Sequence, residues 1–205
     1  MTGRERKFKR DKESKIECVI SAWNQLIAEK GYAGFSINDV PERAGVSIGT
    51  IYRYFPKGKA DILGEAMKRN VTQFMEALNL DTIEESEFAS FWREVIRRYI
   101  ELRREDLLLG IALRETGVVS PELTRDLTPI IVDFYGRFAG RFQSFSFFKN
   151  WPPERLMLRI HAVFTLMGTI REIHLRRPLF DSDEEMVRYL LSIVLLTFEM
   201  PMVRD

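Results

Sequence analysis

The chain has 205 residues, of which 45% are hydrophobic and 30% charged, enough for a small domain and a second one with a sizeable core. A single cysteine, Cys18, excludes an intrachain disulfide and a CxxC metal site, and the two histidines have no partner at metal-ligand spacing. No apolar run approaches a membrane span, and no signal peptide is visible. We therefore expect a cytoplasmic protein without metal, cofactor or membrane contact.

The net charge of +1 hides an asymmetry along the chain. Residues 1–60 hold twelve Lys and Arg against seven Asp and Glu, whereas residues 61–205 hold nineteen against twenty-three. Residues 1–15 are the most basic part, with seven cations and three acids. We expect this stretch to begin as a disordered arm that can contact phosphates, although a solvated tail has the same composition.

The first helix is expected over residues 14–30, where the apolar residues recur at helical spacing. They form one stripe of Ile16, Val19, Ile20, Trp23, Leu26 and Ile27. Gly31 follows as a terminating glycine. Tyr32 and Phe35 lie in the next connection, where we expect them to fill a small core.

Residues 36–55, SINDVPERAGVSIGTIYRYF, predict two short helices joined by a tight turn. Ser36, with Asp39 three residues on, is placed to cap the first helix, and Ser47 to cap the second. Gly45 lies in the turn, which needs a residue that tolerates positive φ. Such a pair forms a helix-turn-helix, whose second helix enters the DNA major groove. An ordinary helical hairpin has the same turn, so the flanking residues decide between them.

The second short helix is expected to bury Val46, Ile51 and Phe55. Its remaining residues are mostly small or able to hydrogen-bond, and residues 43–60 contain no carboxylate, as a surface that faces a polyanion requires. The next helix begins near Lys59, where a lysine and a helix amino terminus together suit a phosphate.

The rest of the chain predicts helices and no hairpin, so we expect an all-α fold of about nine helices. Capping boxes at Thr82–Glu85 and Ser182–Glu185, and prolines at residues 121 and 153, mark helix starts. The expected helices cover residues 59–80, 82–104, 105–116, 121–145, 153–176 and 183–200. We divide the chain into a helix-turn-helix domain, residues 1–60, and a helical domain, residues 61–205.

The last two helices each carry a face suited to another helix. These faces contain Leu158, His161, Ala162, Thr165, Gly168 and Thr169 on the first, and Tyr189, Leu190, Ile193, Val194 and Thr197 on the second. Two copies of this pair can form a four-helix bundle around a twofold axis. Packing within one chain is the alternative.

Aromatic residues are concentrated in the second domain. The set comprises Phe88, Phe91, Trp92, Phe134, Tyr135, Phe138, Phe142 and Phe164, with Met167 beside them. Such a set can line an apolar ligand cavity, but it is more often a solid core. Arg114, Glu115, His161 and Arg171 are candidate polar groups for a cavity.

The phrase GYAGFSINDVPERAGVSIGTIYRYFPKGKADIL, residues 31–63, resembles the DNA-binding domain of TetR-type transcriptional regulators. The shared elements are Gly-Tyr after the first helix, the Ala-Gly-Val-Ser turn, Gly-Thr-Ile-Tyr-Arg-Tyr-Phe, and a lysine before the next helix. The resemblance implies a homodimer formed through the last two helices. It also implies a double-stranded palindromic operator and a small-molecule effector bound in the second domain.

The resemblance assigns roles to individual residues. It implies that Ser36 holds a phosphate and that Tyr54 and Lys59 contact the DNA backbone. The residues on or beside the groove would be Ser47, Ile48, Gly49, Thr50, Tyr52 and Arg53. The effector site would be lined by Phe88, Trp92, Arg114, Phe134, Phe138, His161, Phe164 and Met167.

Ile48 departs from the family pattern, because many members carry Lys or another polar residue there. An isoleucine can touch a thymine methyl but cannot donate to guanine, so base recognition is expected to rest mostly on Arg53. An alternative hypothesis keeps the DNA-binding domain but gives the second domain a protein partner. An enzyme is not expected, since no nucleophile–base pair or metal set is visible.

Overall fold

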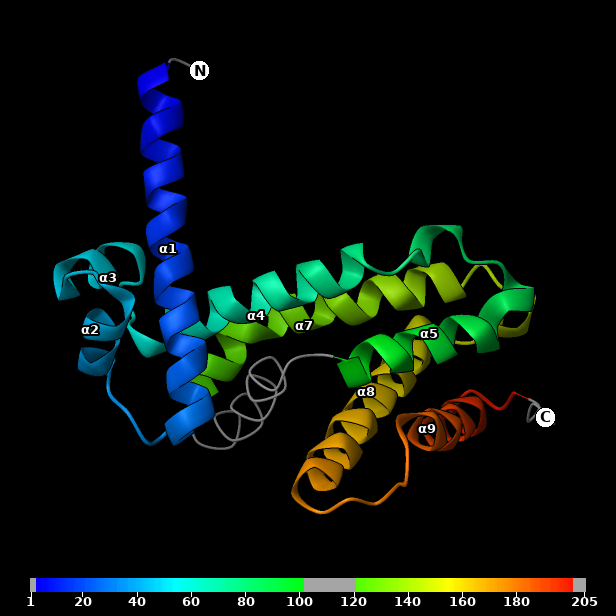
Figure 1. Cartoon of the computed structure of the whole chain (residues 1–205). Coiled ribbons are helices and arrows are strands. Elements are labelled where there is room, and N and C mark those ends of the chain that lie inside the picture. Colours follow the sequence, from blue (N-terminus) through cyan, green and yellow to red (C-terminus); the bar gives the residue numbers. More distant parts are fainter. Residues whose placement is uncertain (1–2, 102–120, 201–205) are drawn as a thin grey trace. The chain divides into compact units, whose positions relative to one another are not determined.

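The computed structural model describes residues 3–101 and 121–200, and these form an all-α fold without strands (Figure 1). This confirms the predicted fold class. The α-helices of the described part are α1 (Gly3–Lys30), α2 (Val40–Ala44), α3 (Ile48–Tyr54), α4 (Lys59–Glu76), α5 (Phe88–Glu101), α7 (Pro121–Phe142), α8 (Pro153–Arg176) and α9 (Asp183–Thr197). Short 3-10 helices cover Ile37–Asp39, Leu80–Thr82, Glu85–Glu87 and Ser146–Phe148. The helix expected over residues 105–116 lies outside the described residues.

The chain divides into two compact units. The first contains the residues up to Val71 together with the start of α7, and the second contains Thr72–Leu102 and the residues from Thr128 onward. The helix-turn-helix therefore lies wholly in the first unit, while α4 and α7 each contribute residues to both.

The first unit is built around α1. The stripe predicted on this helix is buried from Val19 onward, with Val19 and Trp23 fully inaccessible, whereas Ile16 is half-buried; α1 packs against α2. The Trp23 ring meets the ring of Phe35 edge-on at 4.9 Å between centroids. Gly31 ends the helix as predicted, with a φ of +70° and its N–H bonded to the Ile27 carbonyl at 2.9 Å.

The amino-terminal residues are helical, so the prediction of a disordered arm was wrong. α1 begins at Gly3 rather than near Ser14. Lys, Arg and Glu are strong helix formers, and the buried part of α1 supplies the nucleus from which a helix propagates. Lys15 also pairs with Asp11 one turn earlier at 3.0 Å, with the acid nearer the amino terminus.

The helix-turn-helix has the predicted caps and turn. Gly45 has a φ of +63°, and a Cβ there would meet no atom within 4 Å, so the backbone conformation alone requires glycine. The Ser47 hydroxyl accepts the Thr50 N–H at 3.1 Å. Ser36 and Asp39 form a capping box, and hydrogen bonds from the Ser36 backbone N–H and hydroxyl lower the pKa of the Asp39 carboxyl.

In the second unit α9 packs against α5 and α8. The predicted start of α8 is confirmed, and Ser182 caps α9 by accepting the Glu185 N–H at 3.2 Å. The capping box predicted at Thr82 was wrong, because burial of Leu80 and Ile83 holds that segment in a 3-10 turn. Glu84 and Glu87 form the box instead, immediately before α5.

α4 and α7 end earlier than predicted because apolar residues after them turn inward. α4 ends at Glu76, and Leu78 and Leu80 beyond it are buried. α7 ends at Phe142, after which Phe145 and Phe148 enter the core.

Candidate nucleic-acid interface

α3 has one buried and one exposed side. Ile51 and Phe55 are buried and anchor the helix, as predicted, and Val46 is half-buried. Ser47, Gly49 and Arg53 are exposed, with 38% of Ile48 and 47% of Tyr52 accessible. The structure thus presents most of the residues predicted to face the groove on one open surface.

The hydroxyls near this surface already have partners inside the protein. The Thr50 and Ser47 hydroxyls are hydrogen-bonded to each other at 3.0 Å. The Ser36 hydroxyl donates to Asp39 at 2.9 Å and accepts the Asn38 N–H at 3.2 Å. Each hydroxyl therefore shapes a helix start, and a phosphate contact from Ser36 stays a prediction.

Arg53, Tyr54 and Lys12 form a cluster at the end of α3. The Arg53 guanidinium lies 4.9 Å from the Tyr54 ring centroid and donates to the Tyr54 phenolic oxygen at 2.7 Å. The Lys12 ammonium, from α1, lies 5.8 Å from the same centroid. Two cations thus share one aromatic ring, and the contribution of Lys12 was missed because no local sequence signal links residues 12 and 54.

Lys59 points into the first unit. Its Nζ donates to the carbonyls of Tyr32 and Phe35, at 2.5 and 2.7 Å, and lies 4.4 and 4.2 Å from the centroids of their rings. Partial burial lowers the pKa of the ammonium. The predicted phosphate contact would have to compete with these internal bonds, which hold the connection between α1 and α2.

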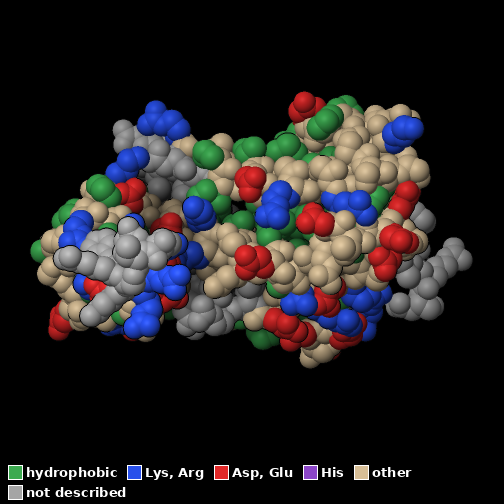
Figure 2. Space-filling model, turned by 90° about the horizontal axis from the view of Figure 1, so that it is seen from above, with side chains coloured by type: hydrophobic (Ala, Val, Ile, Leu, Met, Phe, Trp, Pro, Cys, Tyr) green, Lys and Arg blue, Asp and Glu red, His purple; other side chains and the backbone are tan. Residues whose placement is uncertain are grey.

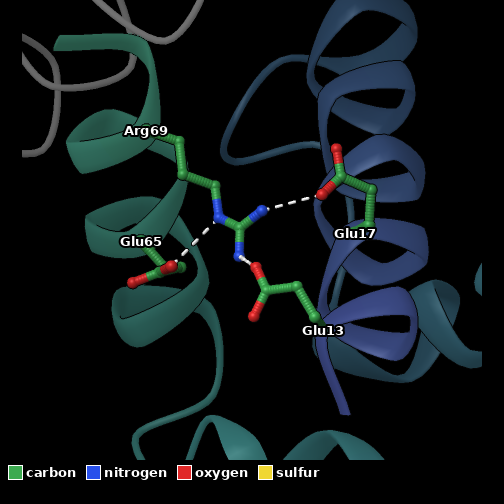
Figure 3. A network of polar contacts seen from close by, with 4 residues as sticks. All are labelled: Glu13, Glu17, Glu65 and Arg69. Carbon is green, nitrogen blue, oxygen red and sulfur yellow. Dashed lines mark hydrogen bonds and ion pairs between the residues drawn. The ribbon is translucent and has the colours of Figure 1, made fainter. Parts of the chain in front are cut away.

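Arg69 of α4 binds three carboxylates at once (Figure 3). It pairs with Glu65 at 3.0 Å on its own helix, with Glu17 of α1 at 2.8 Å, and with Glu13 one turn before Glu17. Burial opposes its charge, but hydrogen bonds to Glu65 and Glu13 outweigh this and raise the Arg69 pKa. The sequence shows no local sign of this network, because residues 13 and 69 are far apart along the chain.

Basic side chains gather around the amino-terminal end of α1. Figure 2 looks down on this end and shows Lys and Arg side chains around it. Arg6, Lys9, Arg10 and Lys12 of this stretch are exposed. The first unit therefore offers positive charge beside α3.

The candidate effector residues form part of one aromatic cluster in the second unit. Phe88, Trp92, Phe138 and Met167 are at most 2% exposed, and Phe134 and Phe164 are also buried. Their ring centroids lie mostly 5–6 Å apart, and the cluster also contains Tyr135 and Phe142 from the predicted aromatic set. It extends further to Phe148 and Phe198, which the predicted set did not include. Arg114 and Glu115 lie outside the described residues.

Two polar groups belong to this cluster. The Trp92 indole N–H is buried and has no hydrogen-bond partner among the described residues. Tyr135 has its pKa raised to about 12, mainly by burial and further by Tyr99, and its ring lies 5.1 Å from the His161 ring. His161 itself is exposed on α8, so its ring lies at the edge of the cluster.

The exposed faces of α8 and α9 carry large apolar side chains. Leu158 and Leu196 are 71% and 64% exposed, and Ile173 and Tyr189 about half exposed. Gly168 and two residues expected on the α9 face, Leu190 and Val194, are instead buried within the chain. The outward face is therefore narrower than the sequence pattern suggested.

Within residues 3–101 and 121–200, no group of three or more His, Cys, Asp or Glu is arranged to hold a metal ion. No helix in these ranges is both long and apolar enough to span a bilayer.

A short helix with an open, carboxylate-free face, anchored on a three-helix core, defines a helix-turn-helix DNA-binding protein. The sequence profile of bacterial regulatory proteins of the tetR family matches residues 19–66. The chain is 34% identical over 135 residues to the fatty acid metabolism regulator protein of Bacillus subtilis, covering 64% of this chain and 68% of that one. The chain belongs to the TetR family and is a DNA-binding transcriptional regulator.

Two further comparisons agree. The HTH-type transcriptional regulator CymR of Pseudomonas putida is 29% identical over 142 residues, which cover 53% of this chain and 67% of that protein. A TetR-family regulator from Syntrophomonas wolfei has the same fold, with a TM-score of 0.71 at 21% identity over 94% of this chain and 99% of that one.

Replacing Lys59 tests its internal role. We expect Lys59→Met to lower the free energy of unfolding by about 1–3 kcal/mol, because two carbonyls lose a charged donor. Urea unfolding measures the change, and Lys68→Met, at an exposed position of the same helix, is the control. If Lys59→Met instead leaves stability unchanged and weakens DNA binding, Lys59 contacts a phosphate.

Proposed function

We propose that the protein is a repressor that binds a palindromic operator as a homodimer and leaves it when a small, largely apolar effector binds the second unit. The observation that carries this proposal is the exposed face of α3, which combines small and hydrogen-bonding residues with Arg53 and lies in a stretch, residues 43–60, that contains no carboxylate. Such a regulator acts where the chromosome is, in the cytoplasm.

Base recognition in this proposal rests on Arg53, with Ile48 touching a thymine methyl. One amino group of the guanidinium is bonded to Tyr54, and the ring of Tyr54 supports its planar face. The remaining donors can meet guanine O6 and N7. Ser47, Gly49, Thr50 and Tyr52 complete the surface, and Gly49 leaves room for close approach.

The dimer is proposed to form through α8 and α9. Monomeric proteins rarely expose large contiguous apolar patches, and Leu158, Ile173, Tyr189 and Leu196 give these two helices an apolar outer face. A dimer with a twofold axis between two such helix pairs has two symmetry-related copies of α3. This symmetry matches that of a palindromic operator, whose half-sites lie about 34–36 Å apart.

The effector is proposed to bind in the aromatic cluster of the second unit. Phe88, Trp92, Phe134, Phe138 and Phe164 suit an aliphatic chain, and the unpaired Trp92 N–H can bind a polar atom of a ligand. The name of the Bacillus subtilis relative, a regulator of fatty acid metabolism, favours a fatty-acid-like compound. The close ring packing also suits the alternative, a second unit that binds another protein.

Arg53 is tested on DNA that the wild-type protein selects from a pool of random duplexes. We expect Arg53→Ala to reduce discrimination between the selected duplex and a scrambled one by about 1–3 kcal/mol. Arg53→Lys keeps the charge but not the bidentate geometry, so it should not restore discrimination. Equal losses on both duplexes, rescued by lysine, would make Arg53 a phosphate contact.

The dimer is tested by introducing charge on its proposed face. Leu158→Glu and Leu196→Glu are expected to shift the protein towards monomer in sedimentation and to weaken binding to the selected duplex. Val132→Glu makes the same change at a half-exposed position of α7 and should leave the dimer intact. A stable dimer in both test variants would contradict the assignment.

The effector is tested with palmitate, and acetate serves as the compound without a chain. Calorimetry should detect palmitate binding, and bound palmitate should lower affinity for the selected duplex, because a ligand shifts the equilibrium only by its preference for one state. Phe138→Ala should weaken palmitate binding. Unchanged DNA affinity at saturating palmitate would exclude palmitate as the releasing ligand.

A further inference from the structure

The amino-terminal part of α1 extends beyond the packed core of the first unit. Its residues 3–15 precede the buried stripe and, at 1.5 Å per residue, span about 20 Å. In Figure 1 this part of the helix reaches past α3. A helix in this position carries its side chains at fixed places, unlike a disordered arm.

Two carboxylates of this segment, Asp11 and Glu13, are paired with cations other than Lys9 and Lys12. Asp11 pairs with Lys15, and Glu13 with Arg69 of α4. Among the residues whose side chains the structure describes, Lys9 and Arg10 have no carboxylate partner. Their positive charge is therefore open to an external anion.

The position of Lys12 shows which side of α1 faces the exposed surface of α3. Its ammonium lies over the Tyr54 ring that also supports Arg53. Lys9 precedes Lys12 by three residues and so lies on nearly the same side, one turn further from the core. Lys9, Lys12 and Arg53 thus extend the positive surface of α3 along α1.

We propose that Lys9 and Lys12 form a second, preformed contact with the DNA backbone, on phosphates that flank the half-site read by α3. The proposal rests on the proposed DNA binding. Phosphates are the chemical class this surface suits, because lysines bind them as point charges without reading bases. Since the helix is already folded, the contact requires no ordering of the chain when DNA binds.

Arg69 is the positioning residue of this contact. Its guanidinium ties Glu13 and Glu17 of α1 to α4, at the level where the extension leaves the core (Figure 3). The three glutamates compensate its charge, so its effect on DNA should act through the position of α1.

The test is the salt dependence of binding to a duplex of mixed sequence. Removing one phosphate interaction should reduce the slope of log K against log salt by about 0.9. We expect Lys9→Gln with Lys12→Gln to reduce it by the equivalent of about two phosphates per protomer and to weaken the selected and scrambled duplexes by the same factor. Lys30→Gln removes a charge at the far end of α1 and should keep the wild-type slope.

Several outcomes would overturn the proposed phosphate contact. A slope unchanged from wild type in the double variant refutes this contact alone, while wild-type protein that binds no DNA refutes the proposed function as well. A weakening confined to the selected duplex would mean that the lysines read bases. Helix content and melting temperature of the double variant should match wild type, since both side chains are exposed.

Arg69 is tested by the same slope. Arg69→Met should reduce it even where the protein remains folded, and Arg69→Lys should restore part of it. If Arg69→Met lowers stability but leaves the slope of log K against log salt at its wild-type value, Arg69 has only a structural role.

Discussion

The position of α3 depends on the contact between the rings of Trp23 and Phe35. The ammonium of Lys59 lies over the Phe35 ring. Trp23 is fully buried, and removing such a ring costs about 3–5 kcal/mol, a large share of the 5–15 kcal/mol that stabilises a typical domain. Phe35 belongs to the connection that leads into the capping box of Ser36, so its position sets where the helix-turn-helix begins. Lys59 holds the carbonyls of that same connection. The surface presented by α3 follows from this arrangement.

Local features of the fold could be predicted from sequence, and features that depend on distant residues could not. The positive φ of Gly45 and the caps at Ser36 and Ser47 are determined by neighbours within three residues. The helical extension at the amino terminus was missed because its composition suits a disordered chain, whereas its stability comes from the buried part of the same helix. Contacts such as Lys12 with Tyr54 depend on packing that no local pattern encodes.

The aromatic cluster of the second unit shows a different limit of sequence reasoning. A solid core and an apolar ligand site are lined by the same kinds of residue, so composition does not distinguish them. The burial of Phe88, Trp92 and Phe138 is consistent with both. An unsatisfied polar group is one physical sign of a ligand site, because a buried N–H without a partner has a cost that a sealed core normally avoids. The Trp92 indole N–H is such a group, but the Trp23 indole N–H in the core of the first unit also lacks a partner among the described residues, so this sign is not specific to a ligand site.

The first part of α4 is joined to the rest of the first unit at two points. Lys59, its first residue, binds the connection before α2, and Arg69, almost three turns later, binds α1. A displacement of this segment therefore carries α1 and the helix-turn-helix with it, since bending within the unit would break charged hydrogen bonds at one point or the other. α4 continues to Glu76 as one helix, so a change transmitted along it reaches α3 and the amino-terminal extension together. In the proposed function, base recognition and flanking phosphate binding would therefore end together, because the same segment of α4 holds both surfaces in place.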